Sequence, residues 1–291
     1  MEFIQQLING LALGSVYALL ALGYTMVYGI IQLINFAHGE IYMIGAFAGF
    51  YSATTLKLPL IPTLLVAMAV SSLAGIIIEK IAYKPLRNSP RITLLITAIG
   101  VSLLLQNSMR ILVGSDPKPF PDLINAGALN IGAVQIQWKT ILMFLVSALL
   151  VIVLQFIVYK TKLGKAMRAE SQDIDASSLM GINVNNTISF TFALGSALAG
   201  IAGVLVAISY PSITPYIGVM PGLKSFVAAV LGGIGSIPGA LVGGLLIGIL
   251  ETLSKAYIST SFSDAIVFGI LILILLIKPS GLLGKKANVK V

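Results

Sequence analysis

Cysteine is absent from the 291 residues, and histidine occurs only once, at His38. The first absence excludes disulfide bonds, thiolate zinc sites, iron–sulfur clusters and cysteine nucleophiles. The second excludes a metal site built from several histidines of this chain. We predict no catalytic residues, no cofactor and no metal ligands in this chain.

Charged residues are also scarce, at 10% of the chain, whereas 57% is hydrophobic and the mean hydropathy is +1.01. A soluble domain is nearer to about 25% charged. One soluble core of this size cannot hide so many apolar side chains, so the partner predicted for them is the lipid bilayer. The net charge of +8 does not indicate nucleic acid, because the charges fall in loops between apolar runs.

Eight apolar segments follow one another along the chain, and most reach the ~20 residues that a helix needs to cross ~30 Å of hydrocarbon. Their predicted ranges are 7–31, 37–56, 60–80, 92–113, 139–159, 187–209, 223–254 and 263–278. Residues 1–6 lack a basic stretch followed by a cleavage site, so the first helix is expected to remain. We predict an all-α, polytopic transmembrane bundle of about 8–10 spans, forming a single domain over residues 1–291.

Lysine and arginine predict the orientation of this bundle. Twelve of the 18 fall in three segments, 80–91, 160–168 and 278–290. Because cytoplasmic loops are enriched in these residues, the three segments are expected in the cytoplasm, with the N-terminus outside and the C-terminus inside. With this orientation the helix before residue 223 ends outside and the last helix must also begin outside. Residues 223–254 must therefore enter the membrane and return to the outer face, as two spans or as a re-entrant half-helix and a helix.

A dense run of glycine and proline supports a break in that segment, at residues 231–239. Interrupted helices in transport proteins expose backbone groups to substrate, and paired interruptions in two halves indicate the pathway. Close helix packing through small residues is a compatible alternative for the later glycines. The residues assigned to the translocation path here are Gly232, Gly233, Gly235, Ser236 and Pro238. The run lacks the Gly-Lys-Ser/Thr ending of a phosphate loop, so no ATP site is predicted.

A second polar interruption lies between the first two apolar runs, at residues 35–40. Ionisable groups at membrane depth are costly and usually face a cavity or a partner. One interpretation is a helix break that lines the translocation path, and the other is a cytoplasmic turn in which Asn35 caps the next helix. The residues assigned to the path are Asn35, Phe36, His38, Gly39 and Glu40. We interpret Gln106, Asn107 and Glu251 as structural, with Glu251 placed to pair with Lys255 at i,i+4.

The longest cytoplasmic loop, 160–186, is polar and carries small or apolar residues at 166, 169, 176, 179 and 180. This pattern predicts a short amphipathic helix that docks on another protein or lies on the bilayer. Three acidic residues, at 170, 173 and 175, argue against an anionic lipid surface. Gly181 is placed to end the helix.

Taken together, these segments resemble the LivH-type permeases of branched-chain amino-acid ABC importers along nearly the whole chain. The resemblance rests on Gly23–Gly29 (GYTMVYG), Ile34–Glu40 (INFAHGE), Gly164–Ile182 and Phe226–Ala240 (FVAAVLGGIGSIPGA). It implies a permease of the bacterial cytoplasmic (inner) membrane, with leucine, isoleucine and valine as substrates. Relatives that carry urea, short amides or other amino acids stay open as alternatives.

The resemblance also implies partners: two cytoplasmic ABC ATPase subunits, a second related permease that forms a heterodimer, and an external substrate-binding protein. It further implies that loop 160–186 contacts an ATPase. The coupling residues assigned there are Arg168, Ala169, Glu170, Asp173, Ala176 and Gly181. ATP hydrolysis would belong to the partners. The rival from another class is an ion-coupled secondary transporter, in which the chain alone transports and His38 or Glu40 couples the ion.

Overall fold

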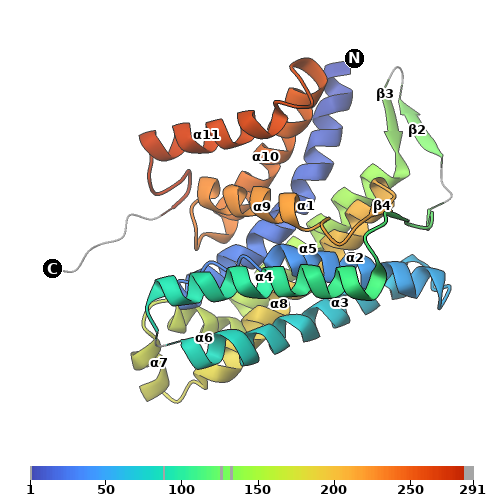
Figure 1. The fold of residues 1–291 in the computed structure, drawn as a ribbon. Coiled ribbons are helices and arrows are strands. Elements are labelled where there is room, and N and C mark those ends of the chain that lie inside the picture. The colour runs from blue at the N-terminus through green and yellow to red at the C-terminus, as the bar shows by residue number, and fades with distance from the viewer. Residues whose placement is uncertain (1, 88, 125–126, 132–133, 285–291) are drawn as a thin grey trace.

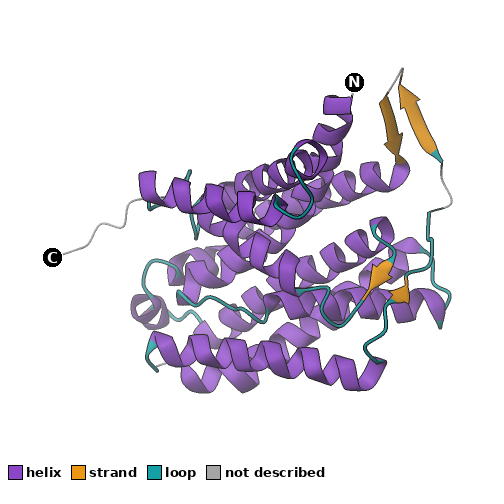
Figure 2. Ribbon diagram, turned by 45° about the horizontal axis from the view of Figure 1, so that its top comes forward, coloured by secondary structure: helices purple, strands orange, loops and turns teal. Residues whose placement is uncertain are grey.

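The computed structural model describes residues 2–87, 89–124, 127–131 and 134–284, so Lys285, Lys286 and Lys290 lie outside it. Helices dominate, with two small strand pairs at one end (Figure 2). The membrane-length helices are α1 (Glu2–Ile31), α3 (Leu60–Ile78), α4 (Arg91–Val113), α5 (Trp138–Lys160), α8 (Val184–Ser209) and α10 (Ile237–Tyr257). Three shorter helices accompany them: α2 (His38–Thr54), α9 (Val219–Gly232) and α11 (Ser263–Ile277). The prediction of a polytopic helical bundle is confirmed.

The apolar runs locate these helices to within a few residues, apart from the start of α1. The break predicted inside 223–254 is also confirmed, because α9 ends at Gly232 and α10 begins at Ile237. With 14 residues, α9 is about 21 Å long at 1.5 Å per residue and cannot cross the hydrocarbon core. Beyond α3 the chain continues through a π-helical turn, η1 (Glu79–Tyr83), and a 3-10 turn, η2 (Lys84–Leu86).

Opposite ends of the bundle carry different kinds of connection (Figure 1). At one end lie the N-terminus, the hairpin of β2 (Ala128–Ile131) and β3 (Val134–Gln137), and the pair of β1 (Lys118–Pro119) with β4 (Ser212–Ile213). The proline-rich loop that precedes the hairpin is held by that second pair. At the other end lie the short helices α6 (Lys162–Glu170) and α7 (Ile174–Leu179). We call these the hairpin end and the loop end.

The centre of the bundle is formed by α1 and α8, and its outer surface by α3, α4 and α5. Eighteen of the 30 residues of α1 are buried, whereas only Leu94 and Ala98 are buried in the 23 residues of α4. Small residues permit close packing at the centre: a Cβ atom on Gly195 would lie 3.2 Å from the Cα of Gly23. Close approach of backbones through glycine is typical of helix packing in membranes.

The two half-helices α2 and α9 begin side by side inside the bundle. A Cβ atom on Gly222 would lie 2.8 Å from the Cα of Gly39, and one on Gly39 would lie 2.5 Å from the oxygen of Gly218. The depth of this contact follows from α1, because His38 packs on Gly23, eight residues before the end of α1 at Ile31. At 1.5 Å per residue the half-helices therefore start about 12 Å from the loop-end terminus of α1.

Candidate functional site

A partly open cavity of about 210 Å³ lies where the two half-helices meet, with residues of α4 along one side. Its polar wall comes from α2 and α4 and its opposite wall from the first turn of α9. The lining residues that matter most are Glu40, Ser102, Gln106, Gly218 and Gly222. The site thus combines segments that are 178 residues apart in the chain, from Glu40 to Gly218, at the depth where both half-helices begin.

Glu40 is the charged group of this cavity, and its side chain is buried. Its Oε1 atom accepts hydrogen bonds from the Nε2 of Gln106 (2.7 Å) and from the Oγ of Ser102 (3.1 Å). Its Oε2 atom accepts none from the described residues. Ser102 and Gln106 are four residues apart on α4, so they share one helix face. The interpretation of Gln106 as structural missed this contact, although the polar spacing along an otherwise apolar helix was the available signal.

The other residues of the 35–40 interruption have separate positions. Phe36 and Gly39 line the cavity with Glu40. The Oδ1 of Asn35 accepts from the backbone N–H of Ala37 (3.1 Å) and from the hydroxyl of Tyr83 (2.7 Å), so it stabilises the turn before α2. His38 packs against α1, with its ring edge-on to Tyr24 at a centroid distance of 4.7 Å. Only three of the five residues therefore meet at the cavity.

The glycine- and proline-rich break between α9 and α10 lies away from this cavity. Gly233 and Gly235 have φ of 105° and 89°, a conformation that side chains with a Cβ rarely adopt. The Oγ of Ser236 accepts from the N–H of Gly239 (3.2 Å) and caps α10, and Pro238 lies in its first turn. The N–H groups of Leu282 and Leu283 donate to the carbonyls of Leu231 and Gly232, at 2.8 and 2.9 Å. The C-terminal segment therefore forms hydrogen bonds with carbonyl groups that we expected to face the substrate.

A cluster of charges, of which the sequence analysis predicted only one pair, joins four helices around Glu251. The Nζ of Lys224 lies 2.8 Å from Oε1 of Glu251 and 2.7 Å from Oδ1 of Asp264. The predicted i,i+4 pair of Glu251 with Lys255 is confirmed at 2.5 Å. The hydroxyl of Tyr17 on α1 donates to Oε2 of Glu251 (2.8 Å). Lys224 follows the cavity residue Leu223 in sequence, but its ammonium group forms ion pairs with Glu251 and Asp264.

The loop-end segment 160–186 contains two helices, α6 and α7, rather than the single helix expected. Glu170 at the end of α6 is buried, and this burial raises the pKa of its carboxyl. The Oδ1 of Asp173 accepts from the N–H of Ala176 (2.9 Å) and caps α7. Gly181, with φ of 83°, follows the end of α7, as predicted. Sequence spacing alone does not reveal the turn at 171–173 that divides the segment.

The six residues assigned to coupling fall into two groups in this segment. Arg168 and Ala169 are half-buried and Glu170 is buried, so all three face the bundle. The guanidinium of Arg168 donates to the carbonyl of Val158. The other three, Asp173, Ala176 and Gly181, are exposed. Between Ala176 and Gly181 lie the two most exposed large hydrophobic residues of the described chain, Leu179 at 89% and Met180 at 83%.

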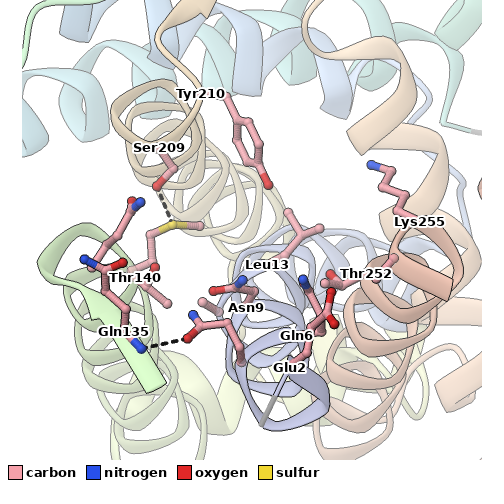
Figure 3. Close-up of a pocket in the computed structure, with 15 residues that line it drawn as sticks. Glu2, Gln6, Asn9, Leu13, Gln135, Thr140, Ser209, Tyr210, Thr252 and Lys255 are labelled. Atoms are coloured by element: carbon pink, nitrogen blue, oxygen red, sulfur yellow. Dashed lines mark hydrogen bonds between the residues drawn. The ribbon is translucent and has the colours of Figure 1, made fainter. Parts of the chain in front are cut away.

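A larger polar cavity of about 900 Å³ opens at the hairpin end (Figure 3). Side chains from α1, α5, α8 and α10 and from the β3 strand face one another across it. The Oε1 of Gln5 accepts from the N–H of Gln135 (2.9 Å), which ties α1 to the hairpin. This larger cavity shares no lining residue with the cavity at Glu40. Its polar lining and the hydrogen bond of Gln5 mark the hairpin end as an open, hydrogen-bonding surface.

These features define a multi-pass helical membrane protein with paired half-helices and, at one end, two short helices followed by the exposed residues Leu179 and Met180. The fold resembles that of a solved structure titled "PsaBC from Streptococcus pneumoniae in complex with Fab", with a TM-score of 0.52 and 16% sequence identity. That match covers 96% of this chain and 93% of the other. At this identity the likeness concerns the fold alone.

The sequence matches the family described as "Branched-chain amino acid transport system / permease component" over residues 6–275. It is 46% identical to the high-affinity branched-chain amino acid transport system permease protein LivH of Escherichia coli K12, covering 99% of this chain and 98% of that protein. It is 44% identical to the corresponding protein BraD of Pseudomonas aeruginosa, covering 100% and 98%. The chain belongs to this family of permease components, as the resemblance suggested.

Proposed function

We propose that this chain is the membrane-spanning permease subunit of an ATP-binding-cassette importer that carries leucine, isoleucine and valine across the bacterial cytoplasmic membrane. The observation that carries the proposal is the full-length similarity to branched-chain amino acid permeases at 44–46% identity. The mixed walls of the cavity at Glu40, apolar with a few polar groups, support a route for small amphiphilic substrates. An external binding protein would deliver the substrate, and ATPase subunits would supply the energy.

Three groups of residues take roles in this proposal. Phe36, Gly39 and Glu40 line the translocation path, and the rest of the assigned path residues shape the two helix breaks. The segment 160–186 is the coupling element that an ATPase subunit contacts. Leu179 and Met180 would be buried by that contact, because isolated apolar side chains so exposed at the end of a bundle gain free energy when covered. A second, related permease would complete the membrane part.

Affinity purification of this chain from its native membrane tests the partnership. ATPase subunits should copurify, and their activity should rise when leucine and the binding protein are added. Leu179→Ser with Met180→Ser removes apolar contact worth about 1.5–3 kcal/mol per side chain, so ATPase retention should fall about tenfold or more. The matched control is Leu56→Ser, since Leu56 is 64% exposed near the end of α2 and lies outside the coupling segment.

A chain that purifies without any ATPase, and that moves leucine in an ion gradient, would instead establish the secondary transporter. The orientation can be tested on the same preparation, because the chain contains no cysteine. In right-side-out vesicles, an impermeant maleimide should label Leu129→Cys on β2 and leave Leu179→Cys on α7 unlabelled. The reverse pattern would contradict a cytoplasmic coupling segment.

A further inference from the structure

The Glu40 carboxylate is only half satisfied, and this is the starting point for a further inference. Its side chain is 2% exposed, both of its donors bind Oε1, and Oε2 has no partner among the described residues. A carboxylate can accept about four hydrogen bonds, and an ionisable group at membrane depth is retained where it faces a cavity or a partner. Because Glu40 lines the 210 Å³ cavity, the unused oxygen has space for a donor that this chain does not supply.

The lysine and arginine residues on the helices that line the cavity contact other groups, beginning with Arg91 on α4, which donates to Oε1 of Gln32 (2.8 Å). Lys224 on α9 pairs with Glu251 and Asp264. Arg110 on α4 donates to the hydroxyl of Tyr216 (3.5 Å). His38 on α2 is buried with its Nε2 against Gly23 and is absent from the cavity lining. The positive group that would complete Glu40 must therefore come from outside this set.

The wall opposite Glu40 is the backbone of the first turn of α9, which lines it through Gly218, Val219 and Gly222. Gly218 and Gly222 have no side chains, so this turn packs directly on Gly39 of α2. The N–H groups of Val219 and Gly222 already donate to the carbonyls of Tyr216 (3.1 Å) and Gly218 (2.8 Å). The charged group that a ligand meets in this cavity is therefore the carboxylate of Glu40.

The remaining lining is apolar and fits a small aliphatic group. It consists of Phe36, Ile99, Leu103, Val219 and Leu223, together with the ring of Tyr24. The volume of about 210 Å³ is below the ~300–1,000 Å³ of pockets for drug-sized ligands, so one small molecule fits. The carboxylate of Glu40 and the apolar wall together match the ammonium group and the side chain of an aliphatic α-amino acid.

We propose that this cavity is a binding site for an aliphatic α-amino acid, with its ammonium group on Oε2 of Glu40. The inference rests on the proposed function, because it places the transported substrate within the membrane part of the importer. It assigns recognition of the ammonium group to the permease in addition to the external binding protein. Ser102 and Gln106 are positioning residues, which hold the carboxylate through its other oxygen.

The test is equilibrium binding of radiolabelled leucine to the purified complex of this chain with its copurifying subunits, without the binding protein. Leucinol, which keeps the ammonium group, should compete with leucine, and 4-methylpentanoate, which lacks it, should compete at least about tenfold less well. Glu40→Gln removes a charged hydrogen-bond acceptor, so the affinity for leucine should fall about 10- to 100-fold. Asn107→Ala, one residue beyond Gln106 and outside the cavity lining, is the matched control and should bind as the unaltered chain does.

A packing role and a charge role for Glu40 predict opposite orders of variants. If Glu40 only fills space, the isosteric Glu40→Gln should bind leucine better than the shorter Glu40→Asp. If it recognises the ammonium group, Glu40→Asp should retain more binding than Glu40→Gln. Size-exclusion chromatography of each complex separates loss of binding from loss of assembly, and the competition by leucinol and 4-methylpentanoate needs no variant.

Parallel import assays keep this inference distinguishable from the proposed function. Unaltered complex that imports no leucine would overturn the proposed function. Complex that imports leucine with the binding protein, yet binds none without it, would overturn the inference alone. So would equal competition by leucinol and 4-methylpentanoate, or an affinity for leucine unchanged in Glu40→Gln.

Discussion

Two carboxylates, Glu40 and Glu251, are equally buried inside the bundle but differ in how many of their oxygens have a hydrogen-bond partner. Glu251 is surrounded by two lysines and a tyrosine, so each of its oxygens has a partner within the chain. Glu40 has two neutral donors on one oxygen and none on the other. The first arrangement ties α1, α9, α10 and α11 together, and the second leaves a cavity ready for a donor. Burial alone therefore does not distinguish these two carboxylates, whereas the completeness of their pairing does.

The largest expected effect comes from breaking the complete cluster. Lys224→Met leaves Asp264 without its partner and removes one of two cations from Glu251, and breaking a buried pair costs about 3–5 kcal/mol. Glu40→Gln should change stability by less than about 1 kcal/mol, because no ion pair within the chain is lost. Unfolding of the two purified variants in detergent measures both changes. Equal losses in the free energy of unfolding would contradict the proposed difference between the two carboxylates.

The contact of the half-helices should be the next most sensitive feature. Gly222→Ala places a Cβ 2.8 Å from the Cα of Gly39, so the two helix starts must separate, at a cost of about 1–3 kcal/mol. The cavity at Glu40 should widen, and leucine import should fall. Gly100→Ala on α4 is the control, because a Cβ there meets nothing within 4 Å, and it should be neutral or stabilising by up to about 1 kcal/mol. Similar losses in both variants would argue against close packing at this contact.

A smaller effect is expected at the exposed edge of the cluster. The side chain of Asp264 is 40% exposed, so solvent screens its pairing with Lys224. Asp264→Asn should therefore lower stability by no more than about 1 kcal/mol. High salt should reduce the difference between this variant and the unaltered chain. A loss as large as that of Lys224→Met would show that Asp264, rather than Glu251, is the principal partner.

A third carboxylate, Glu170, extends the comparison outside the membrane-spanning helices. Burial raises its pKa above 4.5, and neither of its oxygens has a hydrogen-bond partner among the described residues. The folded chain therefore keeps this proton to higher pH than the unfolded chain, so stability falls as pH rises from about 4.5 through the raised pKa. Glu170→Gln should remove that decline in a pH series of unfolding measurements, while Asp175→Asn, exposed on α7, should not. An unchanged decline in Glu170→Gln would assign it to another group.

How far the sequence predicts this molecule depends on the range of the interactions involved. Helix positions were predictable because the bilayer demands ~20 apolar residues, and the break at Gly232 because glycine and proline end helices locally. The pairing of Gly39 with Gly218 was not, since it depends on how two distant segments pack. The sequence drew attention to Glu40 but not to its oxygen without a partner, because the positions of Ser102 and Gln106 follow from the docking of α4. The pairing of Lys224 with Glu251 and Asp264 was not predictable for the same reason.

Import of leucine into proteoliposomes tests the account most directly. The vesicles would contain the purified complex, with ATP inside or outside and with or without the external binding protein. The account predicts that leucine accumulates only when ATP reaches the face that carries α6 and α7 and the binding protein reaches the opposite face, and that no ion gradient replaces ATP. Accumulation by this chain alone, driven by a proton or sodium gradient, would contradict it.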